Sequence, residues 1–445
     1  MAYPETLYRL YGHEDEYPAL DAEGAFSRLA KALAFRTVSG DDADGASFAA
    51  LQDHIRASFP LIMGRSSFEV FGRSVLITLG GADPALEPII LLAHQDVVPA
   101  DEAAWTHPPF SGYMGDEYIW GRGALDIKGM MFAELEAVEL ALLEGLEPRR
   151  GIIFAFGDDE ETVSAGATRL AAVLAERGVH AAFLLDEGVA SPIDGSLFGA
   201  DGRQIQGLCL SQKGFLNLRL TARGKGGHSS NPFGTTSLEK LAHAIASIRD
   251  AMPEPMLTPL LRRALEELGI DADEDLLMQL ARSEEGYPYV ADTMAVTQIE
   301  GSAPSANVLP FDAIATINFR LLPGHGIDPF LDLIRRAAGE DVVVEVLHRT
   351  PSARQDDPGG TLYDALRQSL EHFYPGASFV PLFMCGGCDA IRYERISRQS
   401  VRILPYLVAP EDGSRIHAVD ERLSKRSYLH AIRVLRHFLD SCCFS

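Results

Sequence analysis

The chain has 445 residues, which is too long for a single hydrophobic core and predicts two domains. Hydrophobic residues make up 47% of the chain and charged residues 23%, a balance typical of ordinary globular proteins. The formal net charge of -24 argues against nucleic-acid binding, because contacts with phosphates require a basic surface.

The sequence predicts neither a membrane span nor an export signal. The first twenty residues lack a basic start followed by an apolar run, and no window is apolar over the length that a membrane helix needs. The five cysteines are too sparse, and odd in number, to form a disulfide framework. We therefore expect a protein of the reducing cytoplasm, with no membrane and no nucleic acid among its partners.

The first half of the chain alternates helical patterns with short apolar runs. Apolar residues at helical spacing predict helices over residues 26–35, 47–59, 129–145 and 167–178. Apolar runs predict strands over residues 74–80, 88–94, 151–157 and 181–187. This alternation indicates an α/β fold in which helices cover both faces of a mostly parallel sheet.

From about residue 213 the pattern changes to alternating, half-exposed strands. The predicted order is strand 214–224, helix 237–250, strands 291–301 and 312–324, helix 328–339 and strand 341–348. This order matches the split, ferredoxin-like α+β unit. We therefore predict a larger domain of residues 1–212 and 350–445, with residues 213–349 inserted into it as a smaller, lid-like domain. A Pro-rich acidic stretch, 253–287, is expected to add to the lid.

The last part of the chain returns to the pattern of the first. It predicts a helix over 362–374, strands over 378–384 and 401–408, and a final helix over 427–439. Both ends of the chain therefore contribute to the larger domain.

Five short stretches carry an acid or a histidine of the kind that binds divalent metals. They are HQD at His94, GRGALDIKG at Asp126, DDEE at Glu160 and Glu161, LLDEG at Glu187, and RIHAVDE at His417. Most of them directly follow a predicted strand, and ligands of such sheets gather at the carboxyl ends of strands. Two histidines with three carboxylates suit zinc first, and cobalt or manganese second.

Each stretch also has a plainer interpretation. In this interpretation, the ring of His94 at the strand end only forms a hydrogen bond with a neighbouring carboxylate such as that of Asp96. Asp126 only caps the helix that follows it. The glutamate pair also fits a solvated, acidic helix start. Asp186 competes with Glu187 for the ligand position, although we expect Asp186 to point the other way.

Three further motifs are open to two interpretations. His228, in the glycine-rich loop GKGGHSSNP, is either an oxyanion-stabilising group or a surface histidine. Arg320 is either a clamp for a substrate carboxylate or a member of a structural ion pair. Cys385 and Cys388 form a CxxC motif without the second pair that a zinc site needs, which favours a loop near the cleft. Two basic residues near the aspartate of the second stretch are expected to be structural: Arg122 and Lys128.

Taken together, the motifs resemble one enzyme family over nearly the whole chain. The matching stretches are HQDVVP, WTHPPFSG, YIWGRGALDIKG, FAFGDDEE, FLLDEG, KGGHSSNP, NVLP, INFRLLPG and IHAVDERLS. They resemble the two-zinc amidohydrolases and exopeptidases that include aminoacylase, acetylornithine deacetylase, succinyl-diaminopimelate desuccinylase, carnosinase and glutamate carboxypeptidase. Within that family the chain is most similar to the Gly-Xaa carboxypeptidases and N-acyl-amino-acid hydrolases.

The resemblance implies two zinc ions that share one carboxylate. His94, Asp126 and Glu187 would hold one ion, and Asp126, Glu161 and His417 the other. All five positions carry a residue of the fitting type.

The resemblance also implies the catalytic and substrate-binding groups. Glu160 would be the general base, and Asp96 would orient His94. His228 would reach across the interface of a homodimer, formed through the lid domain, to stabilise the oxyanion in the partner's site. Three residues would contact the substrate: Arg320, Asn307 and Gly387.

The expected function is hydrolysis of the amide bond of an N-acyl amino acid or of a short peptide with a free carboxylate. Two alternatives remain: a metal- or peptide-binding homologue with impaired catalysis, and a dipeptidase that works with one metal. Cys388 stands where the family often has threonine or serine, and TVSAGA follows the glutamate pair in place of a glycine-rich run. The first departure affects a substrate contact, and the second affects the start of a helix.

Overall fold

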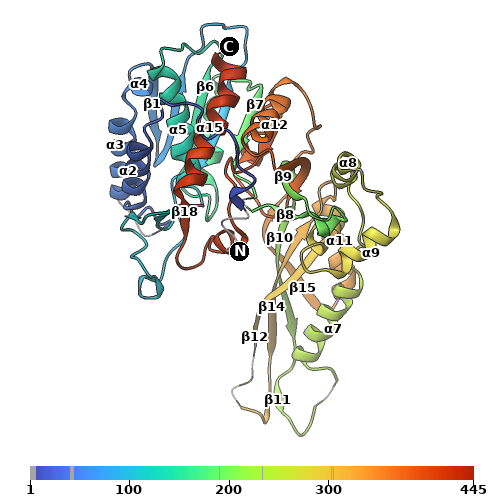
Figure 1. The fold of residues 1–445 in the computed structure, drawn as a ribbon. Coiled ribbons are helices and arrows are strands. Elements are labelled where there is room, and N and C mark those ends of the chain that lie inside the picture. The colour runs from blue at the N-terminus through green and yellow to red at the C-terminus, as the bar shows by residue number, and fades with distance from the viewer. Residues whose placement is uncertain are drawn as a thin grey trace.

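The computed structural model describes residues 7–40, 45–189, 191–232, 234–301, 303 and 305–444. A nine-stranded sheet lies at the centre of the larger part of the molecule (Figure 1). Its strands run in the order β1-β2-β6-β3-β7-β17-β9-β16, with β8 paired to β9. Their bounds are β1 Ser66–Phe71, β2 Ser74–Leu79, β3 Ile89–His94, β6 Ile152–Gly157, β7 Phe183–Asp186, β8 Ile193–Asp194, β9 Gln204–Gln212, β16 Ala377–Met384 and β17 Ser400–Arg402.

The central strands are buried on both faces, which explains their continuous apolar runs. β3 pairs in parallel with β6 on one side and with β7 on the other. Ile89 and Leu91 of β3 belong to one hydrophobic cluster, whereas Ile90 and Leu92 belong to another. This alternation confirms the predicted α/β sheet with helices on both faces.

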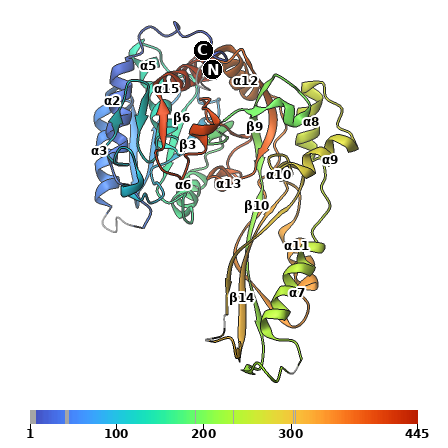
Figure 2. The same ribbon diagram turned by 60° about the horizontal axis from the view of Figure 1, so that its bottom comes forward.

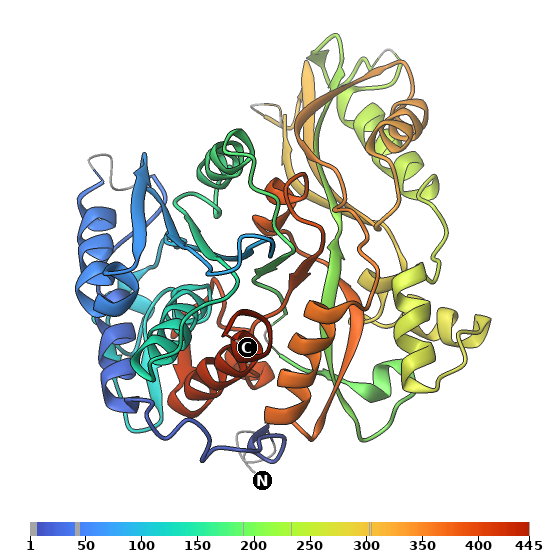
Figure 3. The same cartoon turned by 90° about the horizontal axis from the view of Figure 1, so that it is seen from above.

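Six helices cover the first face of the described sheet, and two cover the second. The first group is α2 Ala22–Leu33, α3 Ala46–Ser58, α4 Pro60–Met63, α5 Lys128–Leu143, α12 Thr361–Phe373 and α15 Lys425–Leu439. The second is α6 Ala165–Glu176 and α13 Ala390–Tyr393. α12 and α15 lie side by side although more than fifty residues separate them (Figure 3). None of the helices in the described ranges is long and apolar enough to span a bilayer.

A separate four-stranded antiparallel sheet projects from the larger part (Figures 1 and 2). Its strands lie in the order β12-β14-β10-β15, so the first and third strands of the unit are central. α7 and α11 pack on one face of this sheet. The bounds are β10 Gly214–Arg223, α7 Ser237–Asp250, β12 Thr293–Glu300, β14 Asp312–Leu321, α11 Ile327–Ala338 and β15 Val342–Thr350. The predicted ferredoxin-like order of strands and helices is therefore present.

The stretch predicted to add to the lid packs elsewhere. It forms α8 Pro259–Leu268, α9 Glu274–Arg282 and α10 Tyr287–Val290. Leu261 and Leu265 of α8 are buried against Cys209 of β9 and Leu382 of β16. These helices therefore cover the end of the large sheet. Their apolar side chains pack on the face of β9 and β16 that would otherwise be exposed to solvent.

Two other elements differ from the sequence expectation. The strand expected over 401–408 is only Ser400–Arg402, and Pro405, which lacks a backbone N–H, follows soon after. The nine-residue strand β9 was not expected, although it is buried along almost its whole length.

The remaining elements are short. They are β4 Tyr113–Met114, β5 Tyr118–Trp120 and β18 Arg422–Ser424 in a three-stranded sheet, β11 Gly227–His228 paired with β13 Val308–Leu309, and α14 Pro410–Gly413. Single helical turns complete the fold at Glu102–Ala104, Gly195–Phe198 and Asp440–Phe444.

Candidate metal centre and active site

The carboxyl ends of three neighbouring parallel strands bring most of the predicted ligands together. His94 ends β3, Glu160 and Glu161 follow β6, and Glu187 follows β7. β3 lies between the other two strands, and His94 is in register with Gly157, the last residue of β6. The side chains therefore meet at one edge of the sheet, as the sequence predicts.

Asp126 lies between the two histidines. Its Oδ1 is 2.9 Å from His94 Nε2, and its Oδ2 is 3.1 Å from His417 Nε2. Burial alone would raise the pKa of Asp126, but the hydrogen bonds with His417 and His94 hold that pKa below its usual range. Each carboxylate oxygen thus faces a different histidine, which is the arrangement of a carboxylate that bridges two cations.

His417 reaches the site from a distant loop between α14 and β18. Its φ is 62°, in the left-handed region that few residues other than glycine adopt. The same loop is attached to the large domain by Asp420, whose carboxylate accepts hydrogen bonds from the backbone N–H and the hydroxyl of Thr106 at 2.7 and 2.8 Å. His417 Nε2 also lies 3.1 Å from the Glu161 carboxylate.

The contacts divide the ligands into two overlapping sets. Glu187 Oε1 lies 3.8 Å from His94 Nε2, on the side of Asp126 Oδ1, whereas Glu161 lies with His417 on the side of Oδ2. Each set holds one imidazole nitrogen and two carboxylates, a donor set that zinc accepts. The two sets share Asp126 and offer the donors that a divalent ion needs, and Glu160 also groups with His94 and Glu187.

The buried negative charges of the site also favour bound cations. Burial raises the pKa of Glu187 well above its usual range, with the charges of Asp126 and Glu160 adding to it. Burial also raises the pKa of Glu160, and the nearby charges of Asp389, Asp126 and Glu161 add to that effect. Crowded, buried carboxylates are costly unless positive charge offsets them. Hydrogen bonds with Asp126 and Glu161 raise the pKa of His417 to about 10, so a proton occupies the place of a cation there.

Asp96 plays a larger part than the sequence indicates. Its carboxylate accepts hydrogen bonds from the backbone N–H groups of Glu160 and Glu161, both at 3.1 Å, and from the hydroxyl of Ser39. His94 Nδ1 lies 2.9 Å from the backbone carbonyl of Asp96 and 3.5 Å from its carboxylate. The backbone carbonyl is thus the nearer partner of His94, while the carboxylate positions the glutamate pair.

Glu421 is a site-building residue that the sequence reasoning missed. It is fully buried and accepts hydrogen bonds from the backbone N–H groups of Leu125 at 2.8 Å and Asp126 at 3.1 Å. Its carboxylate also pairs with Arg122 at 2.7 Å. The only signal in the sequence is its place in the stretch that carries His417. Glu421 therefore couples the loop that carries His417 to the loop that carries Asp126.

The basic residues near Asp126 are structural, as expected. Arg122 donates to Glu421 and, at 3.0 Å, to the backbone carbonyl of Ala418. Lys128 Nζ donates to the backbone carbonyls of two residues at the end of α2, the nearer being Phe35 at 2.8 Å. Burial lowers the pKa of Lys128 to about 7.

Asp186 points away from the ligands, as the sequence analysis expects. Its carboxylate accepts hydrogen bonds from the backbone N–H groups of Ala390 at 2.6 Å and Glu187 at 2.8 Å. The two CxxC cysteines have different partners: Cys388 Sγ lies 3.4 Å from Gln212 Oε1, and Cys385 donates to a backbone carbonyl of α10. These contacts place the CxxC segment beside the site, in keeping with a loop near the cleft.

The stretch TVSAGA leads into the start of α6, and its first three residues, Thr162, Val163 and Ser164, lie in the wall of a cavity beside the glutamate pair. Asp159 accepts hydrogen bonds from the backbone N–H groups of Ala165 at 2.9 Å and Gly166 at 2.7 Å, so it caps the helix. A Cβ at Gly166 would lie 2.2 Å from the Asp158 carboxylate, which explains the glycine there. The ligand positions are not disturbed.

A cavity of about 470 Å³ lies next to the metal ligands and reaches the small domain. Glu160 and Glu161 line it on the large-domain side together with Gly387, and Arg320 and Phe215 line it on the small-domain side. The Arg320 guanidinium stacks on the Phe215 ring at 4.5 Å from its centroid. Within the described residues no carboxylate pairs with Arg320. The geometry does not favour the structural ion pair that the sequence left open.

His228 and Asn307 lie outside this cavity. They meet at the far tip of the small domain, where the backbone carbonyl of Asn307 accepts a hydrogen bond from Ser229 at 2.9 Å (β11 in Figure 1). His228 is exposed, and its Nδ1 lies 2.7 Å from the Ser230 hydroxyl. Neither side chain therefore acts on the metal centre of its own chain in this arrangement.

Comparisons with known sequences agree with these features. A model of peptidase family M20/M25/M40 matches residues 90–441. Probable carboxypeptidase S-like 2 of Dictyostelium discoideum is 28% identical, with 96% of this chain and 86% of the relative covered. N-fatty-acyl-amino acid synthase/hydrolase PM20D1 of Homo sapiens is 31% identical, with 88% of this chain and 82% of the relative covered.

Solved structures share the fold. The metallo-carboxypeptidase Sso-CP2 from Sulfolobus solfataricus superposes with a TM-score of 0.69 at 19% identity, covering 94% of this chain and 98% of that chain. Human carnosine dipeptidase 1 gives a TM-score of 0.64 at 16% identity, covering 98% of each chain. The family match, which spans most of the chain, and the constellation of acids and histidines lead to one conclusion: the chain belongs to peptidase family M20/M25/M40 and is a hydrolase of the metallo-exopeptidase type.

Proposed function

We propose that the protein is a zinc-dependent hydrolase that cleaves the amide bond of N-acyl amino acids or of short peptides with a free C-terminal carboxylate. One observation carries this proposal: a single cavity is lined by Glu160 beside the metal ligands and by Arg320 at its other side. A substrate that spans the cavity would present its amide to the first residue and its carboxylate to the second. Arginine suits that partner because its planar guanidinium binds a carboxylate through two hydrogen bonds.

Two zinc ions are the proposed cofactors, held by His94, Asp126 and Glu187 and by Asp126, Glu161 and His417, with Co²⁺ and Mn²⁺ as alternatives. When bound, they would polarise the scissile carbonyl and lower the pKa of the attacking water. A single ion at full activity is the competing possibility, and the measured zinc content of active protein distinguishes the two.

Glu160 is the proposed general base. Its carboxylate would take a proton from the attacking water and deliver it to the leaving amine. Burial and the neighbouring negative charges raise the pKa of Glu160 when no cation is bound, and cations on the adjacent ligands would oppose that rise and favour the carboxylate that a base needs. Asp96 holds the backbone of Glu160 in place through its hydrogen bond and so fixes the point from which the side chain of the base extends.

The substrate's carboxylate end would be held by Arg320, with a backbone contact from Gly387. Lys213 lies in the same cavity wall, but its Nζ donates to the carbonyls of Pro288 and Ala291 at 2.9 and 2.7 Å. Two of the three N–H donors of the Lys213 ammonium are therefore already engaged with the wall itself. Cys388 also lines the cavity, where its thiol is a weaker hydrogen-bond donor than a hydroxyl.

We also propose a homodimer formed through the inserted domain, residues 213–349, with residues 1–212 and 350–445 as the catalytic domain. The position of His228 and Asn307 at the exposed tip supports this arrangement, because a symmetric pair can bring each tip to the other chain's metal centre. His228 of the partner subunit would then stabilise the oxyanion, and Asn307 of the partner subunit would line the same pocket. The cytoplasm is the proposed compartment, consistent with five cysteines that form no disulfide.

The test is a hydrolysis panel with zinc added: N-acetyl amino acids, long-chain N-acyl amino acids and Gly-Xaa dipeptides, each also as the C-terminal amide. The proposal expects turnover of at least one class and much weaker turnover of its amide. If none of the free acids is cleaved by protein that retains its zinc, the function is instead that of an impaired, metal- or peptide-binding homologue.

A further inference from the structure

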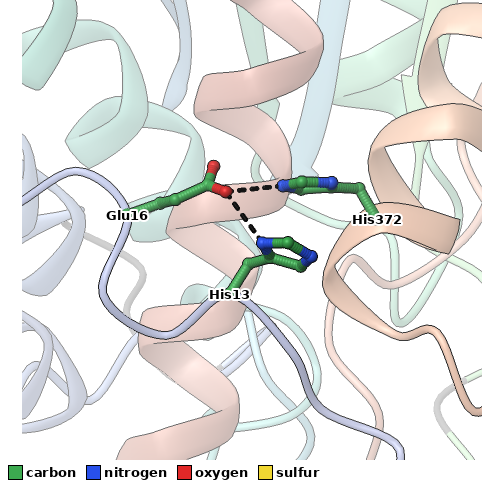
Figure 4. A group of neighbouring side chains, drawn as sticks. All are labelled: His13, Glu16 and His372. Carbon is green, nitrogen blue, oxygen red and sulfur yellow. Dashed lines mark hydrogen bonds and ion pairs between the residues drawn. The ribbon is translucent and has the colours of Figure 1, made fainter.

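A second group of metal-binding side chains lies outside the cavity described above. His13 and Glu16 come from the segment before α2, and His372 comes from the last turn of α12 (Figure 4). Glu16 Oε1 lies 3.0 Å from His13 Nδ1 and 2.7 Å from His372 Nε2. Figure 4 shows one carboxylate oxygen facing both rings, which stack with their centroids 3.7 Å apart.

The backbone holds these three side chains together independently of their mutual contacts. The backbone N–H of Gly12 donates to the carbonyl of Phe373 at 2.9 Å, which joins the segment to the end of α12. Arg433 of α15 donates to the carbonyl of Glu16 at 3.2 Å. His13 has a φ of 56°, and the carbonyl of His13 accepts a hydrogen bond from the N–H of Glu16 at 3.2 Å. A tight turn therefore brings the two side chains of the segment to one side.

Both nitrogen–oxygen separations of the cluster are close to those of a tetrahedral metal site. Zinc bonds to imidazole nitrogen and carboxylate oxygen of about 2.0–2.2 Å imply donor–donor separations of roughly 3.3 Å. The two nitrogen–oxygen separations in the structure, 3.0 and 2.7 Å, need to open by only a few tenths of an ångström. All three donor atoms lie within 4.8 Å of one another, and the side chains are 30% to 48% exposed, so solvent can supply the fourth ligand.

We propose that His13, Glu16 and His372 form a second, independent binding site for Zn²⁺ or a similar first-row transition metal ion. The site clamps the N-terminal segment to the end of α12. It shares no residue with the metal centre of the cavity, so it is occupied or empty regardless of the hydrolase activity.

The surrounding charges are compatible with such an ion. His437 of α15 stacks on the His372 ring at 5.0 Å, and its Nδ1 lies 2.8 Å from the Ser369 hydroxyl. Glu14 pairs with Arg426, so it does not compete with Glu16 for the cluster. Arg433 donates its hydrogen bond to the backbone carbonyl of Glu16 and not to the carboxylate of that residue.

The competing interpretation is an ion pair between Glu16 and protonated histidines with no metal. The number of zinc ions bound per full-length chain distinguishes this ion pair from the proposed metal site. Wild type, His372→Ala and His13→Ala are stripped with chelator, dialysed against a defined free Zn²⁺ concentration near neutral pH, and analysed for zinc per chain. His243→Ala, which removes an exposed histidine of α7, is the matched control.

We expect His372→Ala and His13→Ala each to bind one zinc fewer per chain than wild type and the control. Equal zinc content in all four proteins overturns the proposal. Because loss of a side chain can unfold the segment, a second measurement uses the wild type alone: Zn²⁺ titration followed by the NMR signals of the histidine rings. The signals of His13 and His372 must shift together as one equivalent of Zn²⁺ fills the proposed site. If these signals do not shift, the proposed site is refuted.

The outcome is separable from the proposed hydrolase function. The variant His417→Ala should lose zinc from the cavity and lose turnover, yet retain the ion bound by His13 and His372. Conversely, His372→Ala should keep its turnover. A thermal midpoint that rises further with zinc in the wild type than in His372→Ala would show that the ion stabilises the segment.

Discussion

The carboxylate of Asp96 accepts a hydrogen bond from the backbone N–H of Glu160 at 3.1 Å. Its second oxygen accepts the next N–H, that of Glu161, at the same distance. The carbonyl of Asp96 meanwhile lies 2.9 Å from Nδ1 of His94. One buried residue therefore positions a metal ligand on β3, the proposed base, and a second ligand after β6.

Replacing Asp96 with Asn separates these functions. The amide oxygen accepts only one of the two N–H groups, and we expect the free energy of unfolding to fall by about 2 kcal/mol, the scale of a hydrogen bond to a charged group. Turnover should also fall, whereas zinc at His94 is retained because the Asp96 carbonyl is unchanged. Urea unfolding and zinc analysis measure both effects. Ser39→Ala, which removes only a hydroxyl donor to the same carboxylate, is the control, and an equal cost in both variants would contradict this account.

Glu160→Gln removes the proposed base but not a ligand. We expect kcat to fall by roughly 10²- to 10⁴-fold, the usual contribution of general acid–base catalysis, with the zinc content unchanged. Glu161→Gln is its matched partner, one residue along the chain, and should lose zinc as well as turnover. Steady-state kinetics with metal analysis give the answer. Loss of zinc from Glu160→Gln would reassign that residue as a ligand.

Metal binding should release protons at neutral pH. In the metal-free protein, hydrogen bonds with Asp126 and Glu161 raise the pKa of His417 to about 10, so this histidine is protonated at pH 7. Zinc must displace that proton, and the apparent affinity therefore rises with pH up to about 10 and levels off above it. Calorimetric titrations in buffers of different ionisation enthalpy count the protons.

His417→Ala should release fewer protons than wild type in the same titration. Glu187, whose pKa burial also raises, should contribute to the release that remains. A binding enthalpy that does not depend on the buffer would mean that the ligands are already deprotonated.

Arg320 should matter only for substrates with a free carboxylate. For such a substrate, we expect Arg320→Ala to raise KM by roughly 10- to 100-fold, the loss of a charged hydrogen-bond pair. The C-terminal amide of the same substrate should respond little to the mutation. Arg219→Ala serves as control, because Arg219 lies on the same sheet and pairs with Glu345 at 3.6 Å. Equal loss on acid and amide would assign Arg320 a structural role.

The proposed sharing of His228 between subunits can be tested by complementation. Neither His228→Ala nor Glu160→Gln should turn over substrate alone. In a mixed dimer, however, the His228→Ala chain keeps its own Glu160 and receives His228 of the partner subunit, so one of two sites is complete. Random co-assembly should restore about a quarter of wild-type activity. No recovery in a verified mixed dimer would place His228 outside the active site.

Local patterns were sufficient for much of the fold and for the ligands on strand ends. The strands β3, β6 and β7 are buried on both faces, so short continuous apolar runs, rather than an alternating pattern, mark them in the sequence. Parallel neighbours end at the same edge of a sheet, and this places His94, Glu161 and Glu187 together before any coordinates are known. Their roles as ligands came with the family resemblance, since single acids at strand ends have plainer interpretations.

Other features depend on contacts between residues that are far apart in the chain, and no local pattern records them. Glu421 reaches back nearly three hundred residues to hold the backbone of Asp126. The helices around Leu261 pack on β9 and β16 rather than on the inserted domain. Their apolar side chains are buried there because no other α-helix covers that apolar face of the two strands within the described residues. The cluster of His13, Glu16 and His372 exists only because the turn before α2 meets the end of α12. Periodicity predicts which face of an element is apolar, but the packing of distant elements decides what that face meets.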